Sequence, residues 1–186
     1  MNTCRESGLV LWHASDEPNI EVFHPHRAPT ALADDDLVWA IDDAHVPAYW
    51  FPRDCPRATF WIGPKTSDAD VGWMNGARRV HAIEWDWWDR FRGAKVHLYR
   101  MPPETFSVHD ASAGYYVSHE SVTPLARTEI PDLVRQHADA GVELRLVDNL
   151  WPLWDHVTSS TLAFSGIRLR NARPPVHESS AYALLP

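Results

Sequence analysis

Short apolar segments separated by turn residues constrain the fold of this chain more than any other feature. Most span about four to six residues, which is the length of a β-strand, and end at a polar or turn-forming residue. Residues 11–15 and 37–42 are typical, since both are apolar and both end on a polar side chain. About eight such strands, with few helices and no strand–helix alternation, predict an α+β fold.

Helix and turn signals are few. Pro131 and Gly141 are expected to lie in the first turn and just beyond the end of a helix over residues 130–140. Residues 115–118 and 121–125 are expected to form two strands that meet at a bend. We expect a single domain over residues 1–172, and the prolines and polar residues further on predict a loose tail over residues 173–186.

Size and charge exclude several classes of protein. The 186 residues are enough for one core, and 45% of them are hydrophobic, which excludes bulk disorder. The formal net charge of −8 argues against general binding to a nucleic-acid backbone, although a small nucleotide needs only a few well-placed arginines. No apolar run is long enough to cross a membrane and no secretory signal is visible, so a cytoplasmic location is expected.

Cysteine, histidine and tryptophan each have a structural interpretation. The two cysteines, Cys4 and Cys55, are too few for a disulfide framework. The eleven histidines include His24 and His26, but they lack the paired spacing of a zinc site, so no metal is expected. Most of the ten tryptophans are expected in the core, which leaves one or two to stack on a ligand.

His13 is the first candidate functional residue. It ends an apolar strand, and Ser15 follows at the spacing that shares a strand face. A neutral imidazole beside a hydroxyl can bind the hydroxyls of a ribose. The alternative is a histidine that is hydrogen-bonded within the fold.

The segment 11–15, Leu-Trp-His-Ala-Ser, resembles the Leu-Trp-His-Gly-Ser motif of ADP-ribosyltransferase-like proteins, which include the poly(ADP-ribose) polymerases and the RNA 2′-phosphotransferases. Residues 38–42 and the following Ala48-Tyr49 are similar to the second strand and helix of that family. The order and spacing match over residues 9–51. The run Phe-Pro-Arg-Asp-Cys-Pro-Arg at 51–57 also resembles an uncharacterised bacterial family.

The resemblance implies a fold of split antiparallel β-sheets with few short helices, and NAD as substrate. His13 would bond the nicotinamide ribose, the Ala14 backbone would pair with the carboxamide, and Ser15 would contact the adenosine side. Trp39 and Tyr49 would line the nicotinamide pocket. We expect His13 and Trp39 to lie on neighbouring strands and to face one shared groove.

The catalytic residue of the third family motif is a glutamate at the start of a strand. Glu120 is the best match, and it would stabilise the ribosyl cation. Two departures from the family pattern stand out: Ala14 replaces a glycine, and Ser118 shares the strand face of Glu120 and is the alternative inward residue.

These residues leave three functions open. The first is an NAD-dependent ADP-ribosyltransferase-like enzyme that cleaves the nicotinamide–ribose bond and transfers ADP-ribose to an unknown acceptor. The second is a non-catalytic module that binds a nucleotide or modified base in the same cleft. The third is a cysteine-based enzyme centred on Cys55, in which Arg53 and Arg57 would favour the thiolate and His45 would act as the base. Arg53 or Arg57 is also a candidate for contacting a pyrophosphate.

Overall fold

The computed structural model describes residues 8–27 and 35–175 of the chain. Their contacts group into two compact units, each built from two separate stretches of sequence. Unit 1 takes residues 1–50 and 95–131, and unit 2 takes residues 51–94 and 132–186. Whether they fold as the single domain expected over residues 1–172 stays a prediction.

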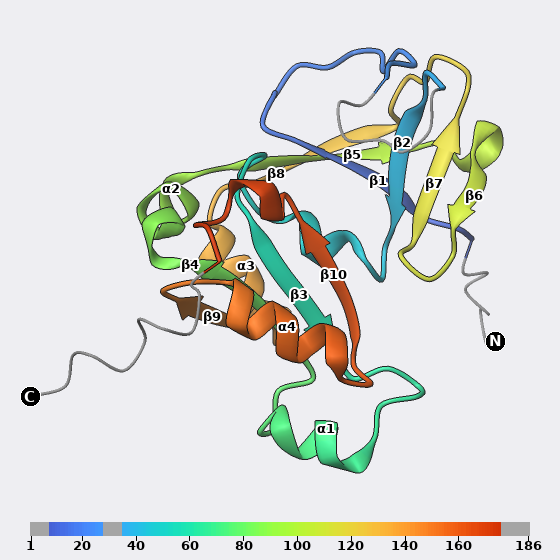
Figure 1. Ribbon diagram of the computed structural model, residues 1–186. Coiled ribbons are helices and arrows are strands. Elements are labelled where there is room, and N and C mark those ends of the chain that lie inside the picture. The colour runs from blue at the N-terminus through green and yellow to red at the C-terminus, as the bar shows by residue number, and fades with distance from the viewer. Residues whose placement is uncertain (1–7, 28–34, 176–186) are drawn as a thin grey trace, which may run out of the picture. The chain divides into compact units, whose positions relative to one another are not determined.

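Unit 1 contains a six-stranded antiparallel sheet (Figure 1). Its strand order is β6-β7-β2-β1-β5-β8, so the two strands of the first two motifs are neighbours. The strands are β1 (Leu11–Ser15), β2 (Val38–Asp42), β5 (Val96–Met101), β6 (Ser107–Asp110), β7 (Tyr115–Ser118) and β8 (Ala126–Ile130). Two 3-10 helices, η1 (Val46–Tyr49) and η3 (Pro103–Thr105), follow β2 and β5.

One face of the unit 1 sheet carries a buried apolar cluster. Strand alternation brings the inward side chains of β1, β2 and β5 to this face. The cluster comprises Leu11, Phe23, Val38, Ala40, Tyr99, Met101 and Val122. The segment 16–27 lies against it, because Phe23 pairs with Val122 and the Tyr99 hydroxyl donates to the Glu17 carbonyl at 2.6 Å.

Unit 2 contains a four-stranded sheet in the order β10-β3-β4-β9, with β4 and β9 parallel and the other pairs antiparallel. Its strands are β3 (Arg57–Trp61), β4 (Arg79–Glu84), β9 (Glu143–Val147) and β10 (Ala163–Ile167). Its helices are α1 (Asp68–Trp73), η2 (Trp85–Trp87), α2 (Trp88–Gly93), α3 (Leu133–Asp139), α4 (Trp151–Ser159) and η4 (Leu169–Asn171).

The two faces of the unit 2 sheet differ in character. The face of Ala58, Phe60, Val80 and Ala82 packs with Leu150 and α4 in an apolar core. The opposite face carries polar side chains that are buried, including Arg57 and His81. In Figure 1, α4 runs in front of this sheet.

The α+β fold class is confirmed, and two local expectations are corrected. Residues 121–125 form an isolated bridge at Val122 rather than a strand, and Glu120 lies in the preceding bend. The helix expected over 130–140 is α3, which begins at Leu133 because Ile130 still pairs in β8 and Asp132 caps the helix through the Arg135 amide. Of the expected tail over residues 173–186, Arg173 makes ion pairs and residues 176–186 lie outside the described residues, so the tail stays a prediction.

Candidate functional site

The pairing of β1 with β2 ends early, beside His13. The register comprises Leu11↔Asp42 and Trp12↔Ile41 and stops there, although β1 continues to Ser15 on its other side, against β5. We call the stretch just beyond the last pair, formed by His13, Ala14 and Trp39, the ladder break. The prediction that the first two motifs occupy neighbouring strands is confirmed.

A side chain takes the place of the strand pairing at the ladder break. Nδ1 of His13 lies 2.8 Å from the carbonyl oxygen of Trp39. A carbonyl only accepts hydrogen bonds, so Nδ1 carries the proton, and in the neutral ring Nε2 is an acceptor. The half-buried His13 is thus hydrogen-bonded to backbone, which is the alternative interpretation of this residue.

The backbone of Ala14 faces β2 where no pairing remains. Asp42 donates its N–H away from β1, to the turn before β7, at 3.0 Å. Backbone groups alternate sides along a strand, so Ile41 directs its N–H and C=O at β1, where Trp12 is its partner in register. Ala14, two residues after Trp12, therefore also directs its N–H and C=O toward β2, beyond the last pair. A planar amide is the chemical group that matches such a donor and acceptor.

The rings of His13 and Trp39 project from opposite faces of the sheet. Trp12 is in register with Ile41, so His13 projects from the face opposite to Ile41 and Trp39. His13 contacts Phe23, with ring centroids 4.6 Å apart. The expectation that both rings face one shared groove is therefore wrong, because the register puts the two rings on opposite faces of the sheet. The two residues are connected by the contact between the His13 imidazole and the Trp39 carbonyl.

Trp39 belongs to an aromatic cluster that includes Tyr49. The Tyr49 hydroxyl donates to the Tyr115 hydroxyl at 2.9 Å, and the Tyr115 ring lies edge-on to Trp39 at 6.1 Å. His109 meets the Trp39 indole at 4.8 Å. Trp39 and Tyr49 thus each contact Tyr115, a residue not singled out from the sequence, and their lining of a common pocket stays a prediction.

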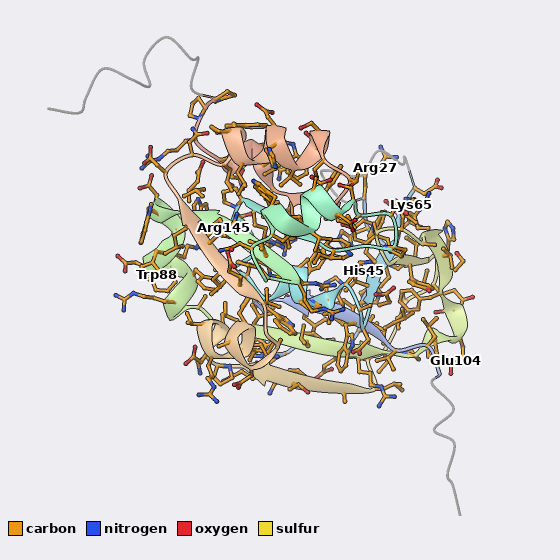
Figure 2. All side chains as sticks on the ribbon, turned by 90° about the horizontal axis from the view of Figure 1, so that it is seen from below. Arg27, His45, Lys65, Trp88, Glu104 and Arg145 are labelled. Carbon is orange, nitrogen blue, oxygen red and sulfur yellow. The ribbon has the colours of Figure 1, made fainter. Side chains whose placement is uncertain are left out.

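A histidine–aspartate pair follows β2 in the same unit. Asp42 accepts from the backbone N–H and from Nδ1 of His45, at 2.9 and 2.7 Å. Gly114 has φ +70°, and a Cβ there would lie 2.3 Å from Nδ1 of His45. The turn before β7 therefore requires glycine. His45 is labelled in Figure 2.

The predicted catalytic residues Glu120 and Ser118 lie at and just beyond the end of β7, and their catalytic role stays a prediction. Ser118 is buried, and its hydroxyl donates to Thr105 and accepts from the Glu120 amide, both at 3.1 Å. Glu120 is exposed beyond the end of β7, whereas the family glutamate begins a strand. Ser15 accepts from the Glu17 amide at 3.1 Å.

Cys55 is sealed in unit 2. Its relative exposure is 0%, and burial raises the pKa of its thiol to about 12, against the opposing effect of Arg57. The structure therefore contradicts the cysteine-based alternative, because the thiol stays protonated and inaccessible. Arg57 is itself buried and donates to the Cys55 carbonyl at 2.8 Å, while Arg53 is exposed in the same loop.

Metal ligands and membrane spans were sought over residues 8–27 and 35–175. No group of three or more His, Cys, Asp or Glu side chains there is arranged to hold a metal ion. No helix within those ranges is long and apolar enough to cross a membrane.

Comparison with known proteins gives one match. The family described as "Family of unknown function (DUF6886)" matches residues 12–172. No curated protein and no solved structure matches the chain. The match bears out the expected similarity to an uncharacterised family, and the resemblance to ADP-ribosyltransferase-like proteins stays a prediction.

Proposed function

The chain belongs to this family of unknown function, and from its own geometry we propose that unit 1 binds a nucleotide at the ladder break without cleaving it. The observation that carries the proposal is the early end of the β1–β2 pairing, where the His13 ring, rather than the backbone of β1, bonds the Trp39 carbonyl.

Two chemical groups at the ladder break suit a nucleotide. The backbone of Ala14 offers a donor and an acceptor to an amide or a base edge. His13 suits a ribose hydroxyl, with its orientation fixed by the Trp39 carbonyl. The cluster of Trp39, Tyr49 and Tyr115 belongs to the opposite face of the sheet, so it is not part of the proposed site.

Cleavage of NAD is the second candidate, favoured by the neighbouring positions of the first two motif strands. It would release nicotinamide and transfer ADP-ribose to an acceptor. The exposed position of Glu120 supports binding over cleavage, because a carboxylate that stabilises a ribosyl cation must face it in a water-poor site. A small nucleotide, rather than a membrane or a nucleic-acid backbone, is the proposed partner, and we propose a cytoplasmic location.

Calorimetric titration with NAD, ADP-ribose and AMP tests the proposal, with nicotinamide release measured on the same samples. We expect binding without release, and a loss of about tenfold or more in affinity for His13→Ala, since one hydrogen bond contributes about 1.5 kcal/mol. His24→Ala is the matched control, because His24 is an exposed histidine of the same unit.

Each outcome decides between the candidates. Binding that His13→Ala and His24→Ala weaken equally would contradict the site. Nicotinamide release that Glu120→Gln abolishes would establish the second candidate. Failure of all three ligands to bind would refute both functions.

A further inference from the structure

Unit 2 holds two histidines in its core, on the sheet face opposite α4. His81 comes from β4 and His137 from α3, and each has a relative exposure of 0%. Their ring centroids lie 5.1 Å apart, and the Phe51 ring contacts both. Neither residue belongs to the proposed nucleotide site, which lies in unit 1.

The protons of the pair can be assigned from its hydrogen bonds. Nδ1 of His137 lies 2.6 Å from the Leu133 carbonyl oxygen, which can only accept, so this nitrogen carries a proton. Nε2 of a neutral His137 is then an acceptor, and His81 must donate to it from Nδ1 across 3.0 Å. The remaining nitrogen, Nε2 of His81, is therefore an unprotonated acceptor.

That nitrogen is buried and has no hydrogen-bond partner among the described residues. It is the position at which the pair takes up an additional proton. Protonation there would place a positive charge in a fully buried site, close to other cations. Arg57 from β3 and Arg79 from β4 both oppose that charge. Of the residues opposite His81 in register, Leu144 has no polar side chain and the Thr59 hydroxyl already donates to the Ser165 carbonyl at 3.0 Å.

Protonation of His137 instead of His81 is also unfavourable. Protonating Nε2 of His137 would set two N–H groups against each other across the 3.0 Å contact, because Nδ1 of His81 already donates there. Arg57 also opposes a charge on His137. The pair is therefore compatible with the folded unit while both rings are neutral.

We propose that the His81–His137 pair is a pH-sensitive element, which stabilises unit 2 at neutral pH and loosens it when either ring is protonated in mild acid. This inference is independent of the proposed nucleotide binding.

The direction of the pH effect follows from the two folded-state pKa values. Burial lowers the pKa of His137 to about 4 and that of His81 well below 6.5. The unfolded chain therefore binds more protons as pH falls below about 6.5, and stability is lost in that direction. Between pH 7 and pH 5, the unfolding equilibrium constant should rise about 20-fold for each ring.

The experiment is urea unfolding of the full chain from pH 7.5 to pH 5, with hydrogen exchange to locate the change. We expect the unfolding constant to rise several hundredfold and protection to be lost in β3, β4 and α3. The variant His81→Leu with His137→Leu removes both rings, and its pH dependence should flatten. His156→Gln, an exposed histidine of the same unit, should keep the wild-type dependence.

Equal pH dependence in the wild type and the double variant would overturn the proposal. If the double variant does not fold, NMR titration of the two imidazoles in the wild type decides the question. Rings that remain neutral in the folded protein down to pH 5 would support the proposal, and rings that titrate near pH 6.5 without loss of structure would refute it.

Discussion

His13 of unit 1 and the His81–His137 pair of unit 2 lie in opposite environments. In unit 1, His13 is half-buried at the ladder break, and its ring bonds a backbone carbonyl that the neighbouring strand leaves unpaired. In unit 2, His81 and His137 are fully buried and bond each other. A half-buried ring beside unpaired backbone can recognise a ligand, whereas a sealed pair can act only through stability. The local pairing of the sheet, and not the residue type, separates the two roles.

The reactivity of the Cys55 thiol is the most sensitive test of whether the core of unit 2 is closed to solvent. With a thiol pKa of about 12, the folded protein at pH 7.5 should react with iodoacetamide at least about a thousandfold more slowly than the unfolded chain. The measurement uses a Cys4→Ser background, so that Cys55 alone is followed by mass spectrometry. Equal rates with and without urea would show that this part of unit 2 is open.

Removing one ring of the buried pair should cost most in stability. His81→Ala leaves a cavity and an unsatisfied His137 nitrogen, so we expect a loss of about 3–5 kcal/mol in the free energy of unfolding. His156→Ala, at an exposed position where the ring contacts Trp73, should change it by about 1 kcal/mol or less. Urea unfolding at pH 7.5 measures both, and a loss for His81→Ala as small as that for His156→Ala would abolish the contrast between the units.

In unit 1, Gly114→Ala tests the close approach of the turn to His45. The new Cβ would meet the imidazole, and φ +70° is itself unfavourable for alanine, so we expect a loss of about 2–4 kcal/mol. Gly76→Ala is the control, because Gly76 has φ +90° with nothing within 4 Å of the added carbon, and it should lose only about 1 kcal/mol. Thermal unfolding compares them, and equal losses would show that the clash is relieved.

The smallest effect concerns the segment 16–27 over the unit 1 sheet. The Tyr99 hydroxyl donates to the Glu17 carbonyl and accepts from the Ile20 amide, so Tyr99→Phe should cost about 1–2 kcal/mol. Hydrogen exchange of residues 16–27 should accelerate, while Tyr116→Phe, at a half-buried tyrosine of the same sheet, should leave it unchanged. Unchanged exchange in Tyr99→Phe would mean that Phe23 and its bridge alone hold the segment.

The sequence predicted strands better than it predicted what lies between them. The motif strands are local apolar runs, so β1 and β2 fall close to the expected residues, and β7 spans the expected residues 115–118. Helix α1 lies in a segment that reads as turns, and only its Ser67 cap, which accepts from the Asp70 amide, marks its start. The bend at Glu120 depends on the pairing of Phe23 with Val122 across about a hundred residues, which no local pattern encodes.

The candidate site was predictable in its residue types but not in its geometry. His13 and Trp39 stand out locally, yet the face from which each ring projects depends on the register of β1 against β2. Tyr115 carries a weak signal, since it opens an alternating strand after Gly114. The burial of Cys55 and the meeting of His81 with His137 depend on packing between distant segments, so spacing alone could not reveal them.

The interleaved composition of the two units has a consequence for the nascent polypeptide. On the ribosome, β1 and β2 emerge long before β5 and β8. In unit 2, β4 likewise emerges long before its parallel neighbour β9. Neither sheet can be completed until most of the chain has been synthesised. Until then, unpaired strand edges remain exposed and can form non-native pairings. Simple truncation therefore cannot isolate either half for study, and a circularly permuted or loop-fused gene would be required.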